Sequence, residues 1–137
     1  MNDSSPEELP IRAETDIVVV RKAVREAATK LGFGITDVTR IITAASELAR
    51  NTFVYAGSGV MRCRVLNRSD KVGIELIFED HGPGIANIDQ ALQAGFTSGG
   101  GLGLGLPGAK RLMDELEIES EAGKGTKITV KKWRKGT

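Results

Sequence analysis

A chain of 137 residues with 40% apolar and 27% charged residues has the size and composition of one globular domain. The 19 basic and 18 acidic side chains leave a net charge of +1, which argues against a dedicated nucleic-acid binder, and one cysteine with one histidine excludes an intrachain disulfide and a Cys/His zinc site of the usual kind. Because there is no long apolar run and no visible signal peptide, we expect a cytoplasmic domain with neither nucleic acid nor membrane as a partner.

The first part of the chain predicts a disordered N-terminus, a short strand and two helices. Residues 1–10 are polar and acidic, and a strand is predicted over residues 11–14. Asp16 is a favourable N-cap for the first helix. The second helix is predicted to begin after Thr36 and to end by Gly57, and its apolar stripe is typical of a helix that faces a core.

The remaining chain predicts strands and shorter helices. Apolar and polar residues alternate over residues 60–67, and residues 72–79 are mostly apolar. A turn separates the two segments, so they are predicted to form a hairpin. Two helices and two further strands are predicted over residues 87–94, 107–116, 118–121 and 127–133. This order predicts the α+β class, as a two-layer sandwich with one mixed sheet in a single domain over residues 11–137.

The second predicted helix carries a polar column. Glu47 and Asn51 lie four residues apart and therefore share a face with Thr43, away from the apolar stripe. Taken alone, this pattern is also typical of a solvated helix face.

A carboxylate and two glycines follow the apolar strand over residues 72–79. Asp80 can accept a hydrogen bond from an exocyclic amine such as that of adenine. Gly82 and Gly84 would allow the backbone to approach a flat ligand closely. The same residues also form a Pro-Gly turn well, so this motif alone is not specific.

A tract rich in glycine, residues 99–108, runs into the next predicted helix. Bare N–H groups at a helix N-terminus favour phosphate, so the tract is interpreted as a lid or a backbone cradle. Residues 103–108 match the dinucleotide fingerprint but lack the strand that should precede it, and residues 123–126 fail the P-loop pattern.

In chain order, these pieces resemble the N, G1, G2 and G3 boxes of the GHKL ATPase and kinase superfamily. The matching residues are Glu47-x-x-x-Asn51, Asp80-x-Gly82-x-Gly84, Gly101-x-Gly103-Leu104-Gly105-Leu106 and Gly123-x-Gly125-Thr126. Each motif is weak alone, but four in the correct order make a specific match. The chain is most similar to the small bacterial serine kinases of partner-switching pathways, through residues 46–51, 95–98 and 105–115.

The resemblance implies the Bergerat fold, with a mostly antiparallel sheet, helices on one face, and ATP and Mg²⁺ as cofactors. It implies that Glu47 is the general base, that Asn51 coordinates Mg²⁺ and that Asp80 binds the adenine amino group. The other nucleotide contacts that it implies are Gly82, Gly84, Gly101, Gly103, Gly105, Leu106 and Thr126. These roles agree with phosphoryl transfer, which depends mainly on positioning and on charge neutralisation.

The resemblance further implies a serine/threonine kinase that phosphorylates a STAS-domain partner and, once released, activates a PP2C-type phosphatase in a stress response. Two alternatives within the fold are an anti-sigma-factor type and a non-catalytic binding module gated by nucleotide. A third is the ATPase module of a histidine kinase. Ser46 stands where histidine kinases often carry histidine, and the glycine tract lacks the arginine expected of the anti-sigma branch.

Overall fold

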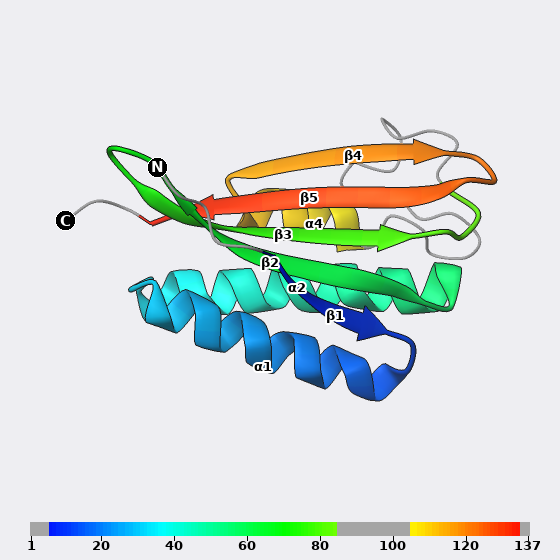
Figure 1. Ribbon diagram of the computed structural model, residues 1–137, viewed down its shortest axis with the longest axis horizontal. Helices are drawn as coiled ribbons and strands as arrows, with labels where there is room; N and C mark the ends of the chain where they lie inside the picture. Colours follow the sequence, from blue (N-terminus) through cyan, green and yellow to red (C-terminus); the bar gives the residue numbers. More distant parts are fainter. Residues whose placement is uncertain (1–5, 85–104, 135–137) are drawn as a thin grey trace.

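The protein is a two-layer sandwich in which helices cover one face of a five-stranded sheet (Figure 1). The computed structural model describes residues 6–84 and 105–134. The described elements are β1 (Glu7–Ile11), α1 (Glu14–Lys30), α2 (Ile35–Ala56), β2 (Gly59–Asn67), β3 (Val72–Asp80), α4 (Gly105–Leu112), β4 (Glu115–Glu121) and β5 (Gly125–Trp133). The predicted α+β class and the helices on one face are therefore confirmed.

The sheet has the strand order β1-β2-β3-β5-β4, and each neighbouring pair is antiparallel. Among the described strands there is no parallel pair, so the expected mixed sheet is antiparallel throughout that part of the chain. The central strand β3 ends at Asp80, directly opposite Thr126 near the beginning of β5. The topology thus places Asp80, which begins the predicted G1 box, next to Thr126, which ends the predicted G3 box.

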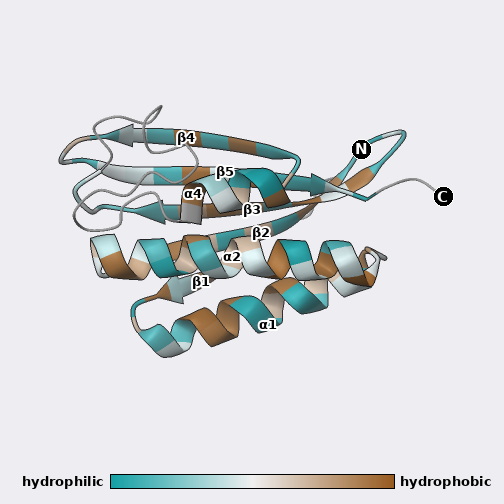
Figure 2. Cartoon of the chain, turned by 180° about the vertical axis from the view of Figure 1, so that it is seen from behind, coloured by the Kyte–Doolittle hydropathy of each residue, from teal (hydrophilic) through white to brown (hydrophobic). Residues whose placement is uncertain are grey.

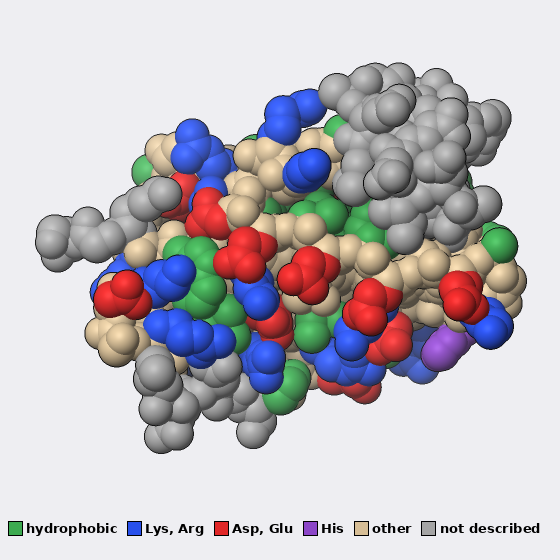
Figure 3. Space-filling model, turned by 90° about the horizontal axis from the view of Figure 1, so that it is seen from above, with side chains coloured by type: hydrophobic (Ala, Val, Ile, Leu, Met, Phe, Trp, Pro, Cys, Tyr) green, Lys and Arg blue, Asp and Glu red, His purple; other side chains and the backbone are tan. Residues whose placement is uncertain are grey.

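The two faces of the sheet differ because side chains alternate along each strand. Met61 and Phe78 are opposite one another on the face that packs against the helices, and both are buried. Arg62 and Glu79 point to the open face, where they form an ion pair of 2.8 Å. Figure 2 shows hydrophobic and hydrophilic residues alternating along the helices, and Figure 3 shows acidic and basic side chains interspersed on the face in view.

The N-terminal part of the chain corrects two expectations. Strand β1 already begins at Glu7 and pairs with β2, so the prediction of disorder is wrong for residues 7–10. Helix α1 has Ala13 as its N-cap, and Asp16 lies in its first turn. The Asp16 carboxylate accepts hydrogen bonds from the N–H groups of Arg12 and Ala13 at 2.8 and 3.1 Å. It therefore binds the backbone that precedes the helix from a position within the first turn, instead of being the N-cap residue.

Helix α2 follows the prediction closely and positions the polar column. It ends at Ala56 and is capped by Gly57, whose φ of 79° is the left-handed conformation that glycine adopts at helix C-termini. None of the helices in the described part of the chain combines the length and apolarity needed to span a membrane.

The third described helix is shorter than expected. Helix α4 ends at Leu112 rather than at residue 116, because β4 starts at Glu115 and pairs along its length with β5. Residue 114 thus precedes the edge strand β4, and Leu116 lies within this strand and packs against the core. The helix predicted over residues 87–94 lies outside the described residues.

Candidate functional site

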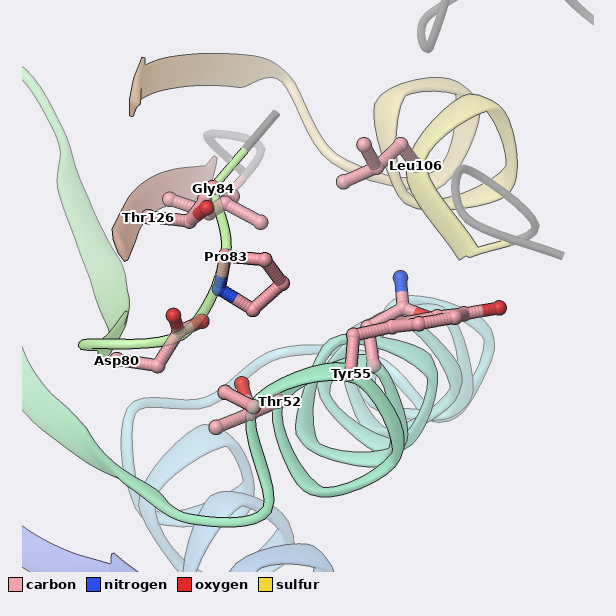
Figure 4. Close-up of a pocket in the computed structure, with 10 residues that line it drawn as sticks. Thr52, Tyr55, Asp80, Pro83, Gly84, Leu106 and Thr126 are labelled. Carbon is pink, nitrogen blue, oxygen red and sulfur yellow. The ribbon is translucent and has the colours of Figure 1, made fainter. Parts of the chain in front are cut away.

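A cavity of about 70 Å³ lies where the C-terminal end of α2, the end of β3, the start of α4 and the start of β5 meet (Figure 4). Figure 4 shows Asp80 and Thr126 on one side of this cavity and Leu106 and Tyr55 on the other. The residues that line it are Asn51, Thr52, Tyr55, Ala56, Asp80, Pro83, Gly84, Leu106, Thr126 and Ile128. Its volume suits the edge of a flat ring rather than a whole nucleotide, since drug-sized ligand sites are roughly 300–1,000 Å³.

The structure brings most of the described candidate residues to this cavity. The lining includes five of them: Asn51, Asp80, Gly84, Leu106 and Thr126. Glu47 lies one helical turn before Asn51 and is half-buried, outside the lining. Gly105 is the first residue of α4, next to Leu106. Gly101 and Gly103 lie outside the described residues.

Asp80 is the polar centre of the cavity. Its Oδ1 accepts the N–H of Gly82 at 2.9 Å, which folds the loop after β3 back onto the carboxylate. Burial raises the pKa of Asp80 above its usual value, and the backbone N–H groups of Gly82 and Thr126 partly oppose this shift. A half-buried carboxylate of this kind gains from any ligand that offers it a hydrogen-bond donor.

The glycines of the loop after β3 have a structural reason that the sequence did not indicate. A Cβ on Gly82 would lie 2.6 Å from the Ala56 side chain, so glycine lets this loop touch helix α2. Gly84 has a φ of +77°, and a Cβ there would collide with the carbonyl of Glu121. At both positions the absence of a side chain makes room for the protein's own chain.

The turn between β4 and β5 is docked on the same loop. The N–H of Gly123 donates to the carbonyl of Pro83 at 2.6 Å. Gly125 has a φ of +104°, and a Cβ there would collide with the backbone of Asp80. The glycines of the G1 and G3 boxes therefore hold the two segments together and place Asp80 beside Thr126.

One row of side chains crosses three strands at this end of the sheet. Asp80 on β3 is opposite Thr126 on β5, which is opposite Ser120 on β4. The Ser120 and Thr126 hydroxyl oxygens are 2.9 Å apart. Thr126 is 9% exposed, and Ile128, two residues along β5, forms an apolar part of the lining.

Sequence reasoning missed five of the lining residues: Thr52, Tyr55, Ala56, Pro83 and Ile128. Helical spacing could have found Tyr55, which follows Asn51 by four residues on the same column. The hydroxyl of Thr52 donates to the carbonyl of Leu48 in its own helix at 3.0 Å. Ile128 enters the cavity only through the pairing of β5 with β3, which local sequence does not reveal.

The sequence matches known proteins over nearly its whole length. Residues 9–132 match the model of the histidine kinase-like ATPase domain. The chain is 49% identical to the serine/threonine-protein kinase RsbT of Bacillus subtilis, with 97% of this chain and 98% of that protein covered. It is 34% identical to an anti-sigma F factor of Clostridium beijerinckii, with 82% of each chain covered.

Solved structures agree on the fold. A structure of the RsbU and RsbW domains of a Mycobacterium tuberculosis protein matches 97% of this chain and 34% of its own, with a TM-score of 0.63 and 21% identity. The mycobacterial sensor histidine kinase MprB matches 97% of this chain and 100% of its own, with a TM-score of 0.57 and 20% identity. The GHKL resemblance is thereby confirmed, and the chain belongs to the histidine kinase-like ATPase domain family.

Proposed function

We propose that the protein is a serine/threonine kinase that uses Mg-ATP to phosphorylate a partner protein in a bacterial partner switch. The observation that carries the proposal is the convergence of Asn51, Asp80 and Thr126, from three distant parts of the chain, on one cavity. The likeness to a serine/threonine kinase over almost the whole of both chains supports the same activity.

The proposed roles follow the arrangement of the site. The adenine edge would enter the cavity with its amino group toward Asp80 and Thr126, while Leu106, at the start of α4, covers the ring. Gly82 and Gly84, after the end of β3, and Gly105, at the start of α4, would hold the nucleotide through the backbone. Gly101 and Gly103 keep the phosphate-binding role implied by the resemblance.

Asn51 and Glu47 would act on the phosphate side of the nucleotide. The Asn51 amide oxygen is a hard neutral ligand that suits Mg²⁺, which supplies charge neutralisation at the phosphates when bound. Glu47 precedes Asn51 by one turn on the same column and is half-buried, so a hydroxyl of a docked partner can approach it. We assign it the role of general base.

The proposed substrate is a serine or threonine of a STAS-domain protein, and the released kinase would bind and activate a PP2C-type phosphatase. The likeness to RsbT and to anti-sigma F factors supports a switch between protein partners. A cytoplasmic location fits this proposal and stays a prediction.

A second candidate is an anti-sigma-factor type or non-catalytic module of the same fold. In this case the nucleotide only sets a conformation, and capture of the partner is the output. The relatives named as anti-sigma F factors, 34% identical over 82% of the chain, favour this candidate.

Phosphate transfer from labelled ATP to a STAS-domain partner, with Mg²⁺ present, tests the proposal. Glu47→Ala should keep ATP binding and lose about 10²–10⁴-fold in transfer rate, the usual contribution of a general base. Thr43→Ala is the matched control: it shortens an exposed side chain one turn earlier, whose hydroxyl donates to the carbonyl of Thr39 in its own helix.

The outcomes separate the two candidates. Full transfer by Glu47→Ala would contradict the assignment of the base. Partner capture that depends on nucleotide, without any phosphate transfer by the unmodified protein, would favour the second candidate.

A further inference from the structure

Two hydrogen bonds link the Ser120 hydroxyl to the beginning of β5. The Ser120 hydroxyl donates to the Gly125 carbonyl at 2.8 Å, and a carbonyl can only accept. Ser120 Oγ also lies 2.9 Å from Thr126 Oγ1. A hydroxyl has one proton, so Ser120 has none left for the second bond. When Ser120 donates to Gly125, Thr126 is the donor toward Ser120.

This direction decides what Thr126 offers to the cavity. Its only side-chain proton points along the sheet to β4, so its oxygen presents lone pairs to a ligand. Its neighbour across the strand pair, Asp80, is acceptor-only when ionised. The wall formed by these two side chains therefore presents adjacent acceptors, while Leu106 and Ile128 contribute apolar surface to the same lining.

We propose that Ser120 is a positioning residue that sets the base specificity of this site, by holding the Thr126 hydroxyl as an acceptor so that a 6-amino purine is selected over a 6-oxo purine. A 6-amino group brings two N–H donors to the acceptor wall. A 6-oxo group brings lone pairs against lone pairs and leaves buried polar groups unpaired. The inference rests on the proposed use of ATP and deepens it.

Ser120 acts through Thr126 rather than on the ligand. It is absent from the residues that line the cavity, whereas Thr126 lines it. The cross-strand register holds the two side chains opposite one another on the same face of the sheet. The local sequence around Ser120, an alternation of glutamates with other residues in an edge strand, does not suggest any role in binding.

Calorimetric titration with adenosine diphosphate and inosine diphosphate, with Mg²⁺ present, tests this inference because the two ligands differ only at two adjacent atoms of the base. These are C6, which carries an amino or an oxo group, and N1, which is an acceptor in adenine and carries a proton in hypoxanthine. In Ser120→Ala the Thr126 hydroxyl is released and can turn to donate into the cavity. We expect the preference for the adenine nucleotide to fall about fivefold, the factor that one ordinary hydrogen bond is worth. Ser120→Thr retains a hydroxyl and should retain most of the preference.

Two controls separate specificity from stability. Thr129→Val alters a neighbouring residue of β5 on the opposite face of the sheet, and the preference should stay unchanged. In a Thr126→Val background, Ser120→Ala should change the preference by less than about twofold, because the group through which it acts is gone. This comparison also serves if the single Ser120→Ala variant is too unstable to titrate.

Each result decides the inference. An equal loss of affinity for both nucleotides in Ser120→Ala would show a structural role and overturn it. An unchanged preference would overturn it as well. Failure of the unmodified protein to bind either nucleotide would instead overturn the proposed function, and the inference with it.

Discussion

The two ends of strand β5 lie in opposite electrostatic situations. At its beginning, Thr126 stands beside Asp80, whose pKa is raised because burial outweighs its two backbone hydrogen bonds. Near its other end, Lys132 is only 6% exposed, and its Nζ donates to the Leu112 carbonyl at 2.9 Å. The beginning of β5 thus lies beside a β3 carboxylate whose charged form is disfavoured by burial, whereas the other end of β5 carries an ammonium group with several partners.

The compensated end joins three elements. Lys132 Nζ lies 3.5 Å from Asp114 and 3.8 Å from Asp37, so β5 is tied to the end of α4 and to the first turn of α2. Beside it, the indole N–H of Trp133 donates to Glu115 at 2.7 Å, and the ammonium group of Lys71 lies 4.1 Å from the ring centre. These contacts hold β5 against α2, α4 and β4, and we call this region the scaffold end of the strand.

The difference agrees with the proposed role of the cavity end in nucleotide binding. Groups that bind ligands are commonly held in states that cost stability until the ligand arrives, whereas scaffold charges are satisfied within the chain. The cavity end accordingly depends on glycines and contains Asp80, whose charged form is disfavoured by burial. The opposite end is held by ion pairs. Four variants, taken from the largest expected effect to the smallest, would break or sharpen this contrast.

Gly84→Ala should have the largest effect, at the cavity end. The φ of +77° disfavours alanine by about 1–2 kcal/mol, and the new Cβ would also collide with the Glu121 carbonyl. We expect a total loss of stability of at least about 2 kcal/mol together with loss of ATP binding. Urea unfolding and calorimetry would measure both. Gly57→Ala is the control for the backbone cost alone, because this left-handed glycine has no described atom within 4 Å of the position of the added Cβ.

Asp80→Asn should separate binding from stability. Loss of the charged acceptor should weaken ATP binding about 10–100-fold, since hydrogen bonds to charged groups contribute about 1.5–3 kcal/mol. An acid whose folded pKa is raised loses stability as the pH rises from its unfolded value through its folded value. The neutral amide avoids this cost, so the melting temperature of the nucleotide-free variant should rise at pH 7. A lower melting temperature would contradict the inference that the buried charge of Asp80 costs stability.

Lys132→Met should act at the scaffold end. It leaves the Leu112 carbonyl without this donor and removes the cation beside Asp114, while Asp37 keeps Arg40 at 3.0 Å. We expect a loss of about 1–3 kcal/mol in unfolding free energy. The adenine-to-hypoxanthine preference should not change, because Lys132 lies at the far end of β5 from Thr126. A change in base preference would show that the two ends are coupled.

Arg62→Gln should have the smallest effect, on the open face of the sheet. Arg62 bridges Glu8 and Glu79 at 2.9 and 2.8 Å, and its hydrogen bond is the main reason that the pKa of Glu79 is lowered from 4.5. A lowered folded pKa contributes stability above the unfolded pKa, and this stability is lost as the pH falls through the folded value.

Because the Arg62 pair is partly exposed, the variant should lose less than about 1 kcal/mol at pH 7. It should also show a weaker fall in stability below pH 4.5, measured by thermal unfolding from pH 2 to 7. An unchanged acid profile would contradict the assigned role of the pair.

The sequence by itself determined the elements whose pattern is local. The apolar stripe of α2, the left-handed glycine at its end and the β2–β3 hairpin all depend on residues close in the chain, and the structure has them within one or two residues of the predicted bounds. The order of the four motifs was likewise readable without coordinates, because a motif is a spacing along the chain.

Only the tertiary structure decided what surrounds those motifs. Pairing with β2 made residues 7–10 a strand, and pairing with β5 ended α4 at Leu112. Register across β3, β5 and β4 placed Asp80, Thr126 and Ser120 in one row. These outcomes depend on contacts between residues far apart in the chain, and the orientation of a hydroxyl depends on its neighbours in space, so a reading of local sequence could not supply them.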